Sequence, residues 1–203
     1  ILSDAGCYEM AKITADDAGL NATLEKLKKY TDITITYTFG DQQEVLDGDT
    51  IVTWIETDGS EITLDETKVA DFVEYLRKTY NTIFTKRTFQ TSYDIEVTLD
   101  KGDYGWWLNT VQETAELTEM IQKGESGERT PVYYQTAASY GTPDYGDTYV
   151  EINLTAQHLL LYVDGEMILE SDFVSGNASR GYDTPAGIYG LTYKQRDATL
   201  SGP

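Results

Sequence analysis

The stretch Thr148–Val174, TYVEINLTAQHLLLYVDGEMILESDFV, decides the class of the C-terminal part of the chain. It contains three runs rich in apolar and β-branched residues, which predict strands over 149–154, 158–163 and 167–174. Asp164-Gly165 separates the last two runs, and this dipeptide suits the type I′ turn of a β-hairpin. The sequence therefore predicts an antiparallel, β-rich region here.

Helical and strand patterns alternate upstream of residue 124. Apolar residues at helical spacing predict helices over 20–30, 65–80 and 110–123, with Asp65 as an N-cap and a Thr110/Glu113 capping box. Alternating and short apolar runs predict strands over 33–39, 51–55 and 93–99. This mixture predicts an α+β fold with helices packed on a mainly antiparallel sheet.

The segment 124–146 is rich in Gly, Ser, Thr, Tyr and Pro, which is typical of a domain boundary. We expect a mixed α/β domain over 1–130, a linker over 131–146 and an all-β domain over 147–203. Residues 175–203 show no further helix or strand pattern. We therefore expect the β domain to be incomplete, with an unpaired strand edge and low stability.

The charge balance excludes one class of partner. The 203 residues carry 15 Lys+Arg against 35 Asp+Glu, a net charge of −20, so nucleic acids would be repelled. Hydrophobic residues make up 40% of the chain and aromatic residues 12%, which favours a folded protein over a disordered one. No apolar run reaches the ~18 residues of a membrane span. Because the chain begins at Ile1, we expect any export or anchor segment to lie upstream.

Cys and His are too few for most catalytic and metal sites. The sequence holds one of each, Cys7 and His158, whereas a zinc site needs about three or four such ligands. No Ser-His-Asp or Cys-His arrangement is visible around either residue. The acidic clusters 47–49 and 100–103 do not have the spacing of a calcium loop. We therefore assign no catalytic residue, no metal site and no cofactor.

Two groups of residues are candidates for substrate binding. Trp106 and Trp107 are adjacent, so on a strand one indole would enter the core and the other would be displayed as a platform for a sugar ring. Ordinary packing between two layers is the alternative. The second group lies on Gly- and Pro-containing loops that could edge a cleft, namely Ser175, Gly176, Thr184, Pro185 and Gly187.

These segments, in this order, resemble the bacterial L,D-transpeptidases that cross-link peptidoglycan. The segments 148–152, 157–159, 174–176 and 184–189, with Tyr162 and Gly165, resemble the first strands of the family's catalytic domain. The segments 86–89, 104–106 and 129–133 resemble the mixed α/β domain that precedes it, which is described as peptidoglycan-binding. The resemblance extends over nearly the whole chain.

The resemblance implies acyl transfer through a Cys thioester. In the family, the thiolate of a Ser-His-Gly-Cys motif attacks the L,D-peptide bond of a donor stem, expels D-Ala and passes the acyl group to an acceptor amine. No Cys or His follows His158, so no catalytic residue is carried over, and we expect the chain to stop before the motif and to be inactive alone. The implied partner is peptidoglycan, as stem peptides or glycan, and the implied location is extracytoplasmic, in the cell wall or at the cell surface.

Two other functions stay open. A non-catalytic wall-binding module would be retained on purified sacculi, and Trp106→Ala or Trp107→Ala would weaken that retention. A cell-surface structural protein or adhesin would use the transpeptidase-like strands only for its architecture and would bind a host protein instead.

Overall fold

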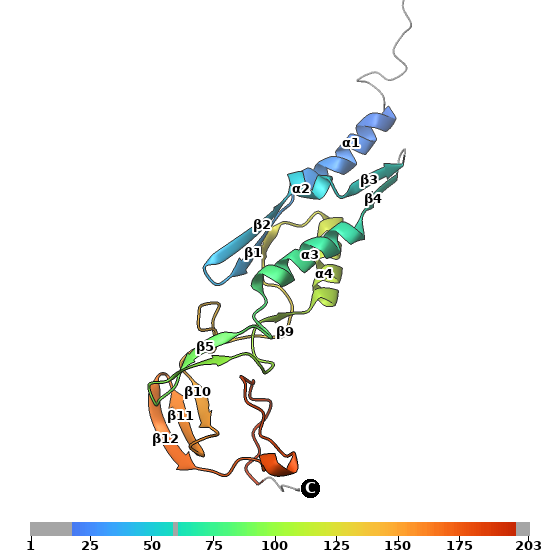
Figure 1. The fold of residues 1–203 in the computed structure, drawn as a ribbon. Helices are drawn as coiled ribbons and strands as arrows, with labels where there is room; N and C mark the ends of the chain where they lie inside the picture. Colours follow the sequence, from blue (N-terminus) through green and yellow to red (C-terminus); the bar gives the residue numbers. More distant parts are fainter. Residues whose placement is uncertain (1–17, 59–60, 198–203) are drawn as a thin grey trace, which may run out of the picture. The chain divides into compact units, whose positions relative to one another are not determined.

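The structure is a computed structural model, and it describes residues 18–58 and 61–197 (Figure 1). The described residues form two compact units. The first comprises 18–38, 43–58, 61–74 and 110–130, and the second comprises 39–42, 75–109 and 131–197. Cys7 lies outside the described residues.

The first unit combines helices with short strands. Its elements are α1 (Ala18–Thr31), β1 (Thr34–Phe39), β2 (Gln42–Asp47), α2 (Gly48–Val52), β3 (Ile55–Asp58), β4 (Glu61–Leu64), most of α3 (Glu66–Tyr80), α4 (Thr110–Lys123) and β8 (Gly127–Arg129). β1 lies between β2 and β8 and runs parallel to β8. β3 and β4 form an antiparallel pair.

Apolar residues of β1, α3 and α4 form the core of this unit. Alternate residues of β1 are buried, as its period-two pattern predicts. Among them is Tyr37, whose hydroxyl donates to the buried Glu113 carboxylate of α4 at 2.7 Å. Arg129 Nε of β8 donates to the same oxygen at 2.7 Å. Burial, with the Glu113 charge second, raises the pKa of Tyr37 well above its ordinary range, so the hydroxyl stays protonated.

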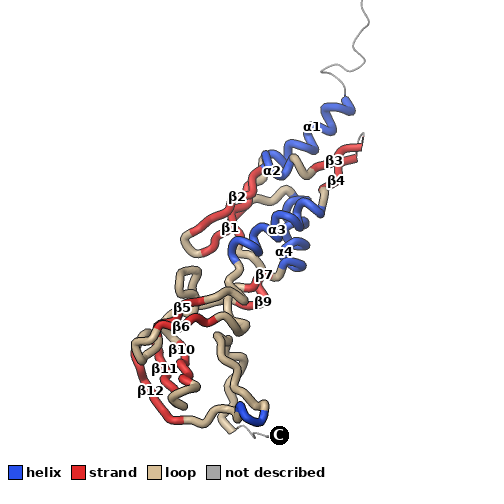
Figure 2. The backbone as a smooth tube through the Cα atoms, viewed as in Figure 1, coloured by secondary structure: helices blue, strands red, loops and turns tan. Residues whose placement is uncertain are grey.

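The second unit contains short strands joined by loops, together with the end of α3. The strands are β5 (Arg87–Gln90), β6 (Glu96–Leu99), β7 (Trp107–Leu108), β9 (Tyr133–Gln135), β10 (Tyr149–Asn153), β11 (His158–Val163) and β12 (Glu166–Asp172), followed by a 3-10 turn at Ala178–Arg180. β5 pairs with β6 and β7 with β9, both antiparallel. β10, β11 and β12 form an antiparallel sheet, drawn as neighbouring red strands in Figure 2.

The C-terminal sheet confirms the three strands expected from Thr148–Val174. Asp164 and Gly165, at the turn between β11 and β12, both have positive φ, 51° and 79°, as a type I′ turn requires. The α+β class is likewise confirmed, with several small and mostly antiparallel sheets in place of one large sheet.

The expected strand over 51–55 is wrong. Residues Gly48–Val52 form the short helix α2, and Asp47 caps it because its Oδ1 accepts from Thr50 N at 2.9 Å. Ile51 is therefore buried from a helix, and the extended chain resumes only at Ile55.

The expected strand over 93–99 begins later than its alternation suggests. Asp94 has a positive φ of 58°, and Thr91 N donates to Ile95 O at 2.9 Å, so residues 91–95 form a turn. β6 starts at Glu96.

The segment expected as a linker, 131–146, contains the strand β9 and the buried Asp144. The division into domains at this segment stays a prediction. In the part of the chain that the structure describes, no helix has the length and apolar character to cross a membrane.

Candidate functional site

Trp106, which immediately precedes β7, and Trp107, its first residue, point to opposite faces. Trp106 is only 9% exposed; its ring stacks on Tyr140 with centroids 3.9 Å apart, and its Nε1 donates to Ser139 O at 2.8 Å. Trp107 is 40% exposed and contacts Phe84 and Tyr134. One indole is therefore packed inside and the other displayed, so of the two candidates Trp107 is the one a ligand can reach.

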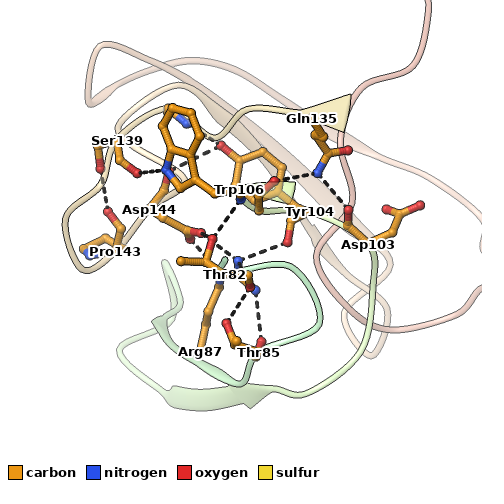
Figure 3. A network of polar contacts seen from close by, with 12 residues as sticks. Thr82, Thr85, Arg87, Asp103, Tyr104, Trp106, Gln135, Ser139, Pro143 and Asp144 are labelled. Atoms are coloured by element: carbon orange, nitrogen blue, oxygen red, sulfur yellow. Dashed lines mark hydrogen bonds and ion pairs between the residues drawn. The ribbon is translucent and has the colours of Figure 1, made fainter. Parts of the chain in front are cut away.

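A buried ion pair fixes the backbone next to these tryptophans. Arg87 donates from Nε and Nη2 to the two carboxylate oxygens of Asp144, both at 2.7 Å (Figure 3). Both side chains are more than nine-tenths buried. Thr82 Oγ1 also donates to Asp144, at 2.5 Å. A bidentate pair of this kind fixes the relative orientation of the two side chains as well as pairing their charges.

The Arg87 guanidinium also donates hydrogen bonds to three backbone carbonyls. It donates from Nη2 to Thr82 O at 2.9 Å and Tyr104 O at 3.0 Å, and from Nη1 to Thr85 O at 3.0 Å. Burial would raise the pKa of Asp144, and the hydrogen bonds from Arg87 and Thr82 outweigh it and hold that pKa below its ordinary value. The carboxylate is therefore charged at neutral pH.

A second set of contacts, also in Figure 3, holds the loop before β7. Gln135 Nε2 donates to Asp103 O at 2.8 Å and to Gly105 O at 3.0 Å. The Tyr104 hydroxyl accepts from Ala138 N at 2.8 Å and donates to Asp144 O at 3.3 Å. Hydrogen bonds of Arg87, Gln135 and Tyr104 therefore connect three loops to one another.

Glu151 joins the β5–β6 turn to the C-terminal sheet. Its carboxylate, nearly buried on β10, accepts from Ser92 N at 3.1 and 3.2 Å and from Ser92 Oγ at 2.5 Å. The Ser92 hydroxyl also lies 2.6 Å from Tyr162 OH on β11. The hairpin is therefore docked on the sheet by a charge-assisted contact.

The loop residues predicted to edge a cleft fall into two places. Ser175 and Gly176 lie together with Thr184, because Gly176 N donates to Thr184 Oγ1 at 2.9 Å and Ser175 N to Gln157 Oε1 at 2.7 Å. Gly187 lies on residues 101–102, where a Cβ would come within 2.6 Å of Lys101 O. Thr184 and Pro185 are exposed.

His158, the single histidine, has Tyr93 within hydrogen-bond distance of one ring nitrogen and Glu170 farther from the other. Nδ1 lies 2.9 Å from Tyr93 OH, and Nε2 lies 3.9 Å from the Glu170 carboxylate. Among residues 18–58 and 61–197, no three metal-binding side chains gather around a common point. These contacts position His158 as a packing residue of the sheet.

Sequence reasoning did not identify Phe84, Arg87 or Asp144 as parts of this region. Arg87 and Asp144 are 57 residues apart, and no local pattern marks their pairing. The tyrosines of residues 131–146 are a visible signal, since Tyr133 and Tyr140 contact Trp106 and Tyr134 contacts Trp107.

Two family models match the chain. One, described as "Putative peptidoglycan binding domain", matches residues 13–129, and the other, the L,D-transpeptidase catalytic domain, matches residues 147–203. No curated protein is a match for this chain.

Two solved structures are similar over most of their length. An Enterococcus faecium L,D-transpeptidase with a Cys-to-Ser substitution is 31% identical, with a TM-score of 0.64, over 89% of this chain and 71% of that one. The Ldtfm–avibactam carbamoyl enzyme is 32% identical, with a TM-score of 0.65, over 91% of this chain and 72% of that one.

The two matched segments are joined by a hydrogen bond between their side chains. Ser92 lies in the first segment and Glu151 in the second, and Asp144 lies between the two. The order of the two models and the identity to solved enzymes agree on one family. The chain belongs to the L,D-transpeptidases that carry a peptidoglycan-binding domain ahead of the catalytic domain.

Proposed function

We propose that this protein cross-links peptidoglycan as an L,D-transpeptidase, with residues 1–130 holding it on the cell wall and residues 147–203 forming the first strands of the catalytic domain. The observation that carries the proposal is the succession of the two matched models on one chain. The 31% and 32% identities to solved L,D-transpeptidases support it.

The proposed reaction is an acyl transfer in two steps. A Cys thiolate attacks the carbonyl carbon of the L,D-peptide bond in a donor stem, the bond to the D-Ala nitrogen breaks, and D-Ala leaves after taking up a proton. The side-chain amine of an acceptor stem then attacks the thioester, loses a proton and releases the thiolate. An amide cross-link replaces the original peptide bond, so no cofactor is required.

The nucleophile is not among these 203 residues. Neither Cys7 nor His158 stands in a Ser-His-Gly-Cys motif, and Nδ1 of His158 lies 2.9 Å from the Tyr93 hydroxyl. The chain therefore supplies wall binding and part of the cleft rim, at Ser175, Gly176, Thr184, Pro185 and Gly187, and we expect it to be inactive alone.

Muropeptide analysis tests the transferase activity. The product of the complete gene, incubated with purified tetrapeptide stems, is expected to release D-Ala and form cross-linked dimers. The 203-residue chain is expected to form none. Failure of the complete product to form dimers would contradict the proposed activity, and dimers made by the 203-residue chain would contradict the assignment of the nucleophile.

A non-catalytic wall-binding module is the second candidate function, and the presence of a single Cys and a single His favours it. Both candidates predict that the 203-residue chain sediments with purified sacculi. They differ in the activity of the complete product, because only a transpeptidase releases D-Ala. A chain that stays in the supernatant would contradict wall binding in both.

We further propose that the protein works outside the cytoplasm, at the cell wall, because both matched domains act on peptidoglycan. Fractionation of the source cells is expected to recover it with the wall or the surface fraction. Recovery in the cytoplasmic fraction alone would contradict this location.

A further inference from the structure

Three exposed aromatic side chains contact one another in the second unit. Phe84, Trp107 and Tyr134 are 68%, 40% and 56% exposed. The ring centroids of Phe84 and Trp107 lie 6.3 Å apart, and those of Trp107 and Tyr134 lie 4.9 Å apart. We call these three residues the aromatic platform. Contiguous apolar surface of this kind marks interaction sites.

The pairing of β7 with β9 determines which aromatic rings are displayed. Successive residues of a strand point to opposite faces. Trp106, the residue before β7, and Tyr133 of β9 have ring centroids 5.0 Å apart on the inner side, where Trp106 is buried. Trp107, the first residue of β7, pairs with Gln135, and the register shifts between Trp107 and Leu108. The Trp107 ring contacts that of Tyr134 on the exposed side. The shared direction of the two rings therefore depends on this local irregularity in the pairing of β7 with β9.

Phe84 is presented by a loop with unusual backbone geometry. Its φ is +61°, a left-handed conformation that is costly for a bulky side chain. Ile83 N donates to Trp106 O at 3.2 Å on one side. On the other side, Arg87 holds the carbonyls of Thr82 and Thr85, as Figure 3 shows.

This loop keeps Phe84 in solvent on a fixed backbone. Burying a phenyl ring stabilises a folded protein. A strained loop that turns the ring outward therefore lowers the free energy of unfolding while it keeps the ring exposed. Strained residues of this kind cluster at binding and catalytic sites. The buried Arg87–Asp144 pair therefore holds the aromatic platform ready for a ligand.

The chemistry of the platform favours sugar rings. One face of a pyranose ring presents C–H groups, which pack on the π face of an indole or phenol. The chain has a net charge of −20, which disfavours the carboxylates of stem peptides and leaves neutral sugar faces unaffected. Phe84 and Trp107 both lie in the segment that matches a peptidoglycan-binding model.

We propose that Phe84, Trp107 and Tyr134 form a binding platform for the sugar rings of the peptidoglycan glycan strand. The inference rests on the wall binding proposed above and adds the ligand class and the residues. Stem peptides are not needed for this contact.

Titration of the 203-residue chain with glycan strands freed of stem peptides tests the platform. Isothermal calorimetry is expected to detect binding by the wild type, and Trp107→Ala is expected to raise Kd by about tenfold or more. Phe84→Ala and Tyr134→Ala are expected to raise Kd by smaller factors. Trp107→Phe, which keeps an aromatic face, should lie between wild type and Trp107→Ala.

Tyr193→Ala is the matched control, because Tyr193 is an exposed aromatic residue of the same unit outside the platform. Its Kd should equal that of the wild type. Near-ultraviolet circular dichroism shows whether each variant is folded. If Trp107→Ala does not fold, Trp107→Phe provides the test in its place.

The outcomes separate this inference from the proposed function. Sedimentation with intact sacculi but no binding to peptide-free glycan would overturn the platform and leave wall binding standing. Unchanged Kd in folded Trp107→Ala or Trp107→Phe would overturn it as well. A wild-type dimer lost in these variants, without glycan binding, would assign the surface to a second copy. A wild-type chain that does not bind sacculi would overturn both proposals.

Discussion

At the scale of single residues, Asp144 is the buried acceptor at the centre of the contacts beside the tryptophans. Its carboxylate accepts two hydrogen bonds from Arg87 and one from Thr82. The same guanidinium donates to the carbonyls of Thr82, Tyr104 and Thr85. Removing one partner of a buried pair leaves the other charge uncompensated. The loops beside the tryptophans therefore depend on both residues.

We expect Arg87→Ala or Asp144→Ala to lower the free energy of unfolding by about 3–5 kcal/mol. Urea titrations followed by near-ultraviolet circular dichroism measure this. The double variant should lose less than the sum of the single losses, because the unpaired charge is gone. Lys123→Ala breaks the exposed pair with Glu119 and serves as the control, which should change little. Strictly additive losses at 87 and 144 would contradict the coupling.

The same pair predicts how stability depends on pH. The folded-state pKa of Asp144 is depressed, so its contribution is complete above the unfolded-state pKa of about 3.9 and is lost as pH falls through the lower folded value. The unfolding midpoints of wild type and Asp144→Asn should differ at pH 6–7 and converge as the pH drops below about 4. A difference that stays constant over this range would show that the charge of Asp144 is not responsible.

At the scale of elements, periodicity predicts the long ones. The apolar spacing of residues 20–30, 65–80 and 110–123 predicts α1, α3 and α4 to within about two residues. The alternation of 33–39 predicts β1, and the run 158–163 predicts β11 at its observed bounds. In each, one pattern extends over several residues and agrees with the local turn or cap.

Short elements and paired surfaces follow from contacts that sequence does not show. α2 spans five residues, and a capping contact from Asp47 makes it a helix although 51–55 has strand-like composition. β7 and β9 have two and three residues and exist because they pair with each other. Of the site, the opposite faces of Trp106 and Trp107 follow from strand geometry, whereas the approach of Phe84 and Tyr134 depends on long-range folding.

The edge of the C-terminal sheet gives an element-scale prediction. Every residue of β12 is exposed, including Met167, Ile168 and Leu169 at 50–59%. β10 is held by Glu151 and β11 lies in the middle of the sheet. Hydrogen exchange should therefore be fastest in β12, because exposed edge hydrogen bonds open most easily.

Glu151→Gln weakens the charge-assisted contact with Ser92 and should speed exchange in β10 more than in β1, which serves as an internal control in the first unit. Uniformly strong protection over 147–174 would contradict the expectation that this sheet is only marginally stable.

At the scale of the whole molecule, one chain carries a match to a peptidoglycan-binding model and a match to a transpeptidase catalytic model. The contact of Ser92 with Glu151 links the two matched segments within the second unit. The order of the two matched segments supports the proposal that wall binding brings the catalytic strands to their substrate. We propose that acyl transfer requires a Cys outside these 203 residues.

Intact-protein mass spectrometry tests that claim most directly. After incubation with tetrapeptide stems, the product of the complete gene should gain the mass of the donor stem less D-Ala, which is the thioester intermediate. The 203-residue chain should gain none, and its Cys7→Ala variant is the control. Acylation of the 203-residue chain that disappears in Cys7→Ala, or no acylation of the complete product, would contradict the account.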